Sequence, residues 1–319
     1  MNGSKRSWNR YWTLGSLAVI FAAAAAAMAI GRFTIAPKEL AAVLIPGSFP
    51  DVQVSGQVRT VISNIRFPRV VLALLSGAGL AAAGAAFQGL FANPLATPDT
   101  LGAANGASFG AVLGILLGLP AFGIQTLAMI TGVAAVLMAW SVAQVRGTIP
   151  PLMVILAGMV VSSLFSALVS LVKYAADPQD VLPSITYWLM GSMASTTRTT
   201  LIMGAPFILA GSLLLFLLRW KLNTMSLPED EAKSLGIPVK RIRSLVILGA
   251  AMVTAAVVSM CGQIGWIGLL IPHMVRMIFG NDNRSVVPAS MASGALFMLI
   301  IHTAARSVMA TEIPVSILT

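Results

Sequence analysis

Charged residues and cysteine are scarce in this sequence. Asp, Glu, Lys and Arg make up 9% of its 319 residues, whereas an average soluble protein contains about 25%. Hydrophobic residues make up 57%. The single cysteine, Cys261, excludes an internal disulfide. This composition excludes the common soluble classes and predicts an integral membrane protein.

Long uncharged stretches show where the chain is expected to cross the membrane. A helix needs roughly 20 apolar residues to span about 30 Å of hydrocarbon. The first such stretch is expected to be a retained helix, because it exceeds the core of about 7–15 residues found in signal peptides. The predicted fold class is an all-α, polytopic helical bundle that forms one domain over residues 1–319. It has nine predicted spans, at residues 12–31, 69–90, 101–118, 122–145, 150–172, 199–219, 243–261, 266–279 and 286–303.

The predicted spans contain no acidic residue. Carriers driven by protons or sodium usually keep an ionisable group at membrane depth. The absence of Asp and Glu from the spans therefore disfavours an ion-coupled secondary transporter, which remains the alternative function. The sequence also lacks a G-x-x-x-x-G-K-[ST] phosphate-binding loop. Any use of ATP must then depend on a partner protein.

The sequence offers no residue set for catalysis or for metal binding. We find no nucleophile and base that would suit an intramembrane enzyme. The only other histidine in the sequence besides His273 is His302, and a metal site needs more ligands. We predict no catalytic residue, no metal ligand and no cofactor bound by this chain.

The net charge of +10 is interpreted as topological, not as a sign of nucleic-acid binding. With the N-terminus inside, twelve of the 20 Lys and Arg residues lie on the cytoplasmic side. This modest excess agrees with the positive-inside rule and favours a cytoplasmic N-terminus.

Charge is concentrated in one internal loop, residues 222–243. Ser226 and Glu229 have the S-x-x-E spacing of a capping box, and Gly236 is suited to end a helix. These signals predict a helix of about nine residues, close to 13 Å long, that projects Leu227, Ala232 and Leu235. A short helix capped at both ends between two spans favours a docking site for a soluble partner over an ordinary solvated surface.

Glycine and proline mark three further features. Glycines at 102, 106, 110, 114 and 118 line one face of the third span and predict close helix packing. Two prolines in residues 91–99 end the second span and indicate a reentrant turn. Residues 177–192 indicate an interfacial helix or a vestibule for cargo.

Eight short segments of this chain resemble one known family: the membrane-spanning permeases of bacterial ABC importers for ferric siderophores, haem and vitamin B12. The resemblance runs through most of the chain, in order. The segments are RFPR at 66–69, QGL at 88–90, NPLA at 93–96, WLMGS at 188–192, EAKSLG at 231–236, GWIGLLIPH at 265–273, AR at 305–306 and EIPV at 312–315.

The resemblance implies a permease domain of ten spans in the bacterial cytoplasmic membrane. It implies a dimer of this chain or with a paralogue, two cytoplasmic ATPase subunits that hold ATP and magnesium, and an external substrate-binding protein. The expected cargo is a ferric siderophore or a similar bulky metal complex, with haem, cobalamin or molybdate as alternatives. Only nine spans precede Thr319, so a tenth helix is expected to be missing.

The resemblance also assigns candidate roles to residues. Arginines at matching positions receive the carboxylates of the binding protein, while the alternative is that they snorkel to the membrane interface. Residues 222–243 become the cytoplasmic coupling loop. The candidates are Ser226, Glu229, Asp230, Glu231, Ala232, Leu235 and Gly236 for ATPase coupling, Arg66, Arg69 and Arg306 for docking, and Asn93, Trp188, Gly191, Gly265, Gly268 and His273 for the translocation path.

Overall fold

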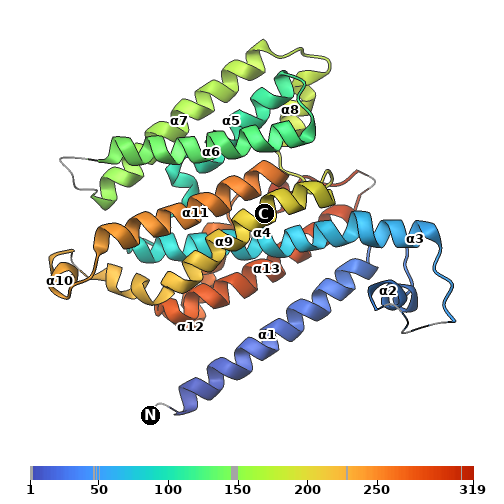
Figure 1. Cartoon of the computed structure of the whole chain (residues 1–319), viewed down its shortest axis with the longest axis horizontal. Helices are drawn as coiled ribbons and strands as arrows, with labels where there is room; N and C mark the ends of the chain where they lie inside the picture. The colour runs from blue at the N-terminus through green and yellow to red at the C-terminus, as the bar shows by residue number, and fades with distance from the viewer. Residues whose placement is uncertain are drawn as a thin grey trace.

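The structure is a computed structural model that describes residues 3–45, 47, 49, 51–144, 150–227, 229–309 and 311–319. All regular elements in these ranges are helices (Figure 1), which confirms the all-α prediction. They are α1 (Gly3–Ala29), α2 (Pro37–Leu44), α3 (Gly56–Thr60), η1 (Val61–Arg66), α4 (Phe67–Leu90), η2 (Pro98–Leu101), α5 (Ala103–Leu116), α6 (Ala121–Ala143), α7 (Pro151–Ala175), α8 (Val181–Leu189), α9 (Arg198–Leu222), η3 (Asn223–Ser226), α10 (Glu229–Ser234), α11 (Val239–Cys261), α12 (Ile267–Phe279), α13 (Asn283–Ser307) and α14 (Val315–Leu318).

The helices match the nine predicted spans, although their lengths differ. Within the described residues, six helices are long and apolar enough to cross a membrane, and three shorter apolar helices accompany them in α1, α5 and α12. The second span begins at Gly56 and not near residue 69, because α3, η1 and α4 continue as one helix through Pro68. The sequence places the boundary too late because a proline such as Pro68 is also typical of the first turn of a helix.

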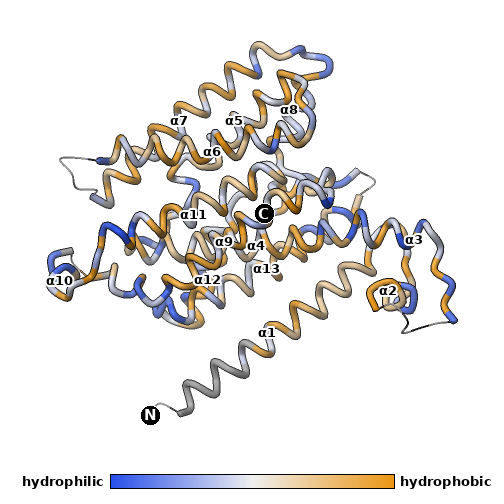
Figure 2. Tube along the Cα trace, in the orientation of Figure 1, coloured by the Kyte–Doolittle hydropathy of each residue, from blue (hydrophilic) through white to orange (hydrophobic). Residues whose placement is uncertain are grey.

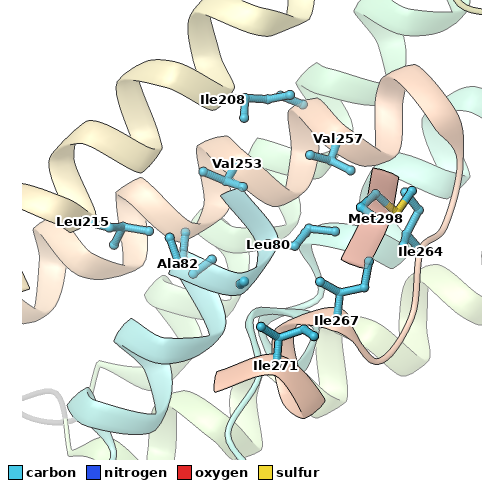
Figure 3. Close-up of a cluster of buried hydrophobic side chains, with 14 of the residues drawn as sticks. Leu80, Ala82, Ile208, Leu215, Val253, Val257, Ile264, Ile267, Ile271 and Met298 are labelled. Carbon is cyan, nitrogen blue, oxygen red and sulfur yellow. The ribbon is translucent and has the colours of Figure 1, made fainter. Parts of the chain in front are cut away.

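Helix α4 forms the centre of the bundle. It contacts α13, α9, α11 and α12, and its side chains from Leu80 to Leu90 are buried without interruption. The side chains in Figure 3 show how α4 and its neighbours share one core, which includes Leu80, Ala82, Ile208, Leu215, Val253, Val257, Ile264, Ile267, Ile271 and Met298. Apolar helices gain little from leaving lipid for one another, so dispersion contacts of this kind hold the bundle together.

Glycine pairs bring the backbones of neighbouring helices into contact. A Cβ atom built on Gly77 would lie 2.2 Å from the carbonyl oxygen of Gly294, and one built on Gly84 would lie 1.7 Å from that of Gly268. No other residue allows α4 to approach α13 and α12 so closely. Helix α4 is therefore locked between these two neighbours by residues that lack a side chain.

The glycine stripe predicted in the third span is confirmed in its central part. Added Cβ atoms on Gly106 and Gly110 would collide with atoms of α6, and one on Gly114 would meet Ile124. Gly102 and Gly118 lie at the ends of α5, where their φ values of +81° and +65° turn the chain. The outer two glycines thus delimit the helix, and Gly102 also packs against α7, where an added Cβ would lie 3.2 Å from Val161.

Polar residues gather at two ends of the bundle, with an apolar zone between them (Figure 2). Helix α10 lies at one end together with the start of α1 and of α11, while α2, α3 and α8 lie at the other (Figure 1). This distribution suits a bilayer, because polar segments at both ends remain in water while the apolar middle meets hydrocarbon.

Candidate functional site

Helix α10 is a short helix that protrudes from one end of the bundle (Figure 1). It has six residues, Glu229–Ser234, so it is about 9 Å long and shorter than predicted. Gly236 has a φ of +75°, and the Gly236 and Ile237 amides donate to Lys233 and Ala232 carbonyl oxygens at 2.9 and 3.1 Å. These bonds form a Schellman motif, which confirms that Gly236 ends the helix.

The predicted start of this helix can be followed only in part. The side chains of Ser226 and Glu229 lie outside the described residues, so the capping box stays a prediction. Asp230 and Glu231 are exposed, and Leu235 is 68% exposed. A leucine beside two carboxylates is therefore presented to the surroundings.

The prediction that Ala232 projects from the helix is wrong. Its side chain is only 1% exposed, because α10 packs against η3 and α11. A helix this short must turn one face toward the bundle to be held there. Ala232 therefore anchors α10, and the outward contact surface consists of the exposed leucine and acids.

The three arginines predicted to receive a binding protein are engaged within the chain. The Arg66 guanidinium donates to the carbonyl oxygens of Met28 at 2.6 Å, Ala29 at 2.9 Å and Phe33. The Arg306 guanidinium donates to Ala27 and Ile30 carbonyl oxygens. Both side chains are buried. They satisfy the carbonyls that a helix end leaves without partners, and their positive charge complements the negative end of the helix dipole.

This burial corrects the structural basis of the docking prediction. Arg66 and Arg306 form no exposed surface here, and they serve instead as the C-terminal cap of α1. Arg69 is partly exposed, yet it pairs with Glu312 at 2.6 Å and donates to the carbonyl oxygen of Ala194. Docking of an external protein stays a prediction. Of the three arginines, only Arg69 is accessible at the surface for it.

Trp188 and Gly191, two candidate path residues, belong to a packed junction near the end of α11. The Ser192 amide donates to the Cys261 carbonyl at 2.8 Å, and the Val315 amide donates to the Gly191 carbonyl at 2.8 Å. Gly191 has a φ of +71°, and an added Cβ would lie 2.3 Å from the Gln263 carbonyl oxygen. The WLMGS segment thus connects the end of α8 to α11 and α14 through backbone hydrogen bonds.

The other path candidates do not converge on one point. Asn93 forms the turn after α4, where its side-chain oxygen accepts from the Leu95 amide at 2.9 Å. Gly268 packs against Gly84, whereas Gly265 has open space around it. His273 is exposed on α12. The described residues contain no group of three or more His, Cys, Asp or Glu that could hold a metal ion.

Sequence reasoning missed a set of polar residues in the α10 half of the bundle. Arg276 of α12 donates to the side-chain oxygens of Gln88 and Asn283, and Asn283 donates to Asn223. The signal was available: Arg276 is the one charge within the predicted span 266–279. A buried charge needs polar partners, but sequence alone does not say which residues supply them.

The comparisons with known proteins decide the family. Residues 17–319 match the FecCD transport family. The chain belongs to this family. The match confirms the resemblance drawn from the short segments, and it places the protein among membrane permeases.

Relatives in the FecCD family carry several kinds of cargo. The chain is 38% identical to the molybdate import system permease protein MolB of Haemophilus influenzae, over 92% of this chain and 86% of that protein. It is 34% identical to the hemin transport system permease protein HmuU of Yersinia pestis, over 80% of this chain and 78% of that protein.

A solved structure shares the whole architecture. It belongs to a protein assigned to the metal-chelate type of ABC transporter and shows an inward-facing conformation. The TM-score is 0.84 at 37% identity, with 96% of this chain and 93% of that one covered. The fold of this FecCD member is thus that of an ABC importer permease.

Proposed function

We propose that this chain is the path-forming subunit of an ABC importer and that a separate ATPase subunit docks on α10. Helix α10 is the observation that carries the proposal. It presents Leu235, Asp230 and Glu231 outward while Ala232 fixes it to the bundle. An exposed leucine in an acidic surround, held by a rigid cap, is a suitable anchor for a protein interface.

The proposed orientation places α10 in the cytoplasm, where ATP is available. The start of α1 lies at the same end (Figure 1), so this orientation also puts the N-terminus in the cytoplasm. Lys233, Lys240 and Arg241 lie at this end too, as the positive-inside rule favours. Helix α8, at the other end of the bundle, then faces the exterior (Figure 1).

The proposed cargo is a ferric siderophore or another metal complex, with haem, cobalamin and molybdate as the alternatives. Relatives support this range, because they include permeases named for molybdate, cobalamin, iron chelatin and hemin. A panel of radiolabelled molybdate, ferric siderophore, haem and cobalamin offered to the same transporter distinguishes them. The partners we propose are a second permease copy or a paralogue, two ATPase subunits and an external binding protein.

The coupling role is tested by removing the exposed contacts of α10. The double variant Glu231→Ala with Leu235→Ala is expected to lower the affinity for the cognate ATPase subunit at least about tenfold, or about 1.4 kcal/mol, because a buried interface anchor is lost. Affinity is measured with the purified, detergent-solubilised permease. The protein should remain in the membrane in normal amounts, because both side chains point away from the bundle.

A matched control comes from the last turns of α9, at the same end of the molecule but outside residues 222–243. Leu217→Ala with Lys221→Ala also removes one exposed leucine and one exposed charge, four residues apart. It should bind the ATPase subunit as the unaltered chain does. Equal binding by the α10 variant and the control would show that the ATPase docks elsewhere.

A further inference from the structure

A chain of polar side chains links four helical segments beside α10. The Arg276 guanidinium of α12 donates to the Gln88 side-chain oxygen at 3.2 Å, to the Ala85 carbonyl at 3.0 Å and to Asn283 Oδ1 at 3.0 Å. Gln88 and Ala85 belong to α4, and Asn283 begins α13. Asn283 is only 2% exposed. The contacts fix α12 to both α4 and α13.

The same series of hydrogen-bonded side chains continues to η3, the segment before α10. Asn223 is the first residue of η3, which connects α9 to α10. Its Oδ1 accepts from the Asn283 amide at 2.8 Å and from Asn283 Nδ2 at 2.9 Å. Its Nδ2 donates to Asp282 Oδ1 at 2.7 Å. The η3 segment is thereby tied to the polar contacts of α12.

Room for this contact is made by a glycine. A Cβ on Gly89 would lie 3.0 Å from both the Nδ2 and the Oδ1 atom of Asn283, closer than ordinary contacts. Polar side chains are costly in an apolar bundle unless they are fully bonded. Once bonded, such a network is stiff, because its members have little freedom to rearrange without leaving a polar atom unsatisfied.

We propose that Asn223 and Asn283 are positioning residues that transmit a displacement of α10 to α12 through Arg276. This inference rests on the proposed ATPase contact at α10. A shift of η3 must either carry Asn283 and Arg276 with it or break the bonds between them. Hydrogen-bonded chains that join two rigid elements are a physical route for such coupling. Helix α12 exposes Met277 and Ile278, so its displacement alters an accessible surface.

The test measures whether ATP changes the accessibility of α12. Met277, 77% exposed, is replaced by cysteine, and its rate of labelling by a polar maleimide is measured with and without ATP in the complex with the ATPase subunit. Cys261 is buried, so the background is low. ATP should change the labelling rate at least about fivefold, the scale of a typical coupling between sites.

Two variants separate transmission from simple packing. Asn223→Ala removes the bonds to Asn283 and Asp282 but leaves those of Arg276 in place. It should reduce the effect of ATP on labelling to less than about twofold, with ATPase binding and ATP hydrolysis retained. The exchange Asn223→Asp with Asp282→Asn keeps an acceptor at position 223 and restores a donor between the two side chains. It should recover the response to ATP.

The outcomes distinguish this inference from the proposed function. A full response in Asn223→Ala, or no ATP response in the unaltered chain that binds the ATPase, overturns the transmission role and leaves docking at α10 intact. Failure of the exchange variant to recover the response also overturns it, provided that the variant binds the ATPase. If the unaltered chain binds no ATPase subunit, the proposed function fails first.

Discussion

Gly84→Ala is expected to separate α12 from α4 and to lower the midpoint of thermal unfolding by about 5 °C or more. The added Cβ would lie 1.7 Å from the Gly268 carbonyl oxygen and 2.5 Å from its carbonyl carbon. These are backbone atoms, so no side chain can move aside. The helices must part, and the core side chains shared by α4 and α12 lose contact. The midpoint is measured by following unfolding of the purified protein in detergent.

The matched control for this substitution is Gly15→Ala in α1. Gly15 also lies within a helix, but an added Cβ has no atom within 4 Å. Alanine is the better helix former by about 1 kcal/mol, so the control should be unchanged or slightly more stable. Equal stability of the two variants would mean that α4 and α12 are not held in backbone contact.

Arg66→Leu is expected to release the end of α1 from the bundle. The substitution removes the donors to the carbonyl oxygens of Met28, Ala29 and Phe33. A buried acceptor left without a partner costs about 1–3 kcal/mol. The bond to Met28 is buried and those to Ala29 and Phe33 are part-buried, so the loss of stability should be about one such penalty, with a smaller addition from the other two. The expected result is a clear fall in the unfolding midpoint, together with faster proteolysis between α1 and α4.

Arg59→Leu supplies the comparison for Arg66. It changes the same residue type within the same long helix, Gly56–Leu90, but Arg59 is exposed. Its loss should leave both measurements close to those of the unaltered protein. If Arg66→Leu weakened only the affinity for an external binding protein, with stability unchanged, the docking role would be restored to Arg66.

Apolar runs and local stop signals were sufficient to predict the main features of the fold. The positions of the spans follow from hydrocarbon thickness, which acts on composition over some 20 residues. The end of α10 follows from Gly236 alone, because its left-handed conformation is a local property. In these cases a few neighbouring residues decide the structure.

Contacts between distant segments could not be predicted. Arg66 at the start of a span has the spacing of an interfacial anchor, yet its acceptors lie at the end of another helix. The sequence predicts that Ala232 projects together with Leu227 and Leu235, but packing on η3 and α11 buries it. Arg276 was visible as a charge in a span, whereas its partners come from residues 85, 88 and 283.

The source of energy for transport tests the account most directly. The permease is reconstituted in liposomes with its ATPase subunit and external binding protein, and uptake of radiolabelled molybdate, ferric siderophore, haem and cobalamin is measured in separate samples. We expect uptake of one of these with ATP supplied on the ATPase side, and none with a proton gradient alone. Uptake driven by the gradient in the absence of ATP and of the ATPase subunit would contradict the account and identify a secondary transporter.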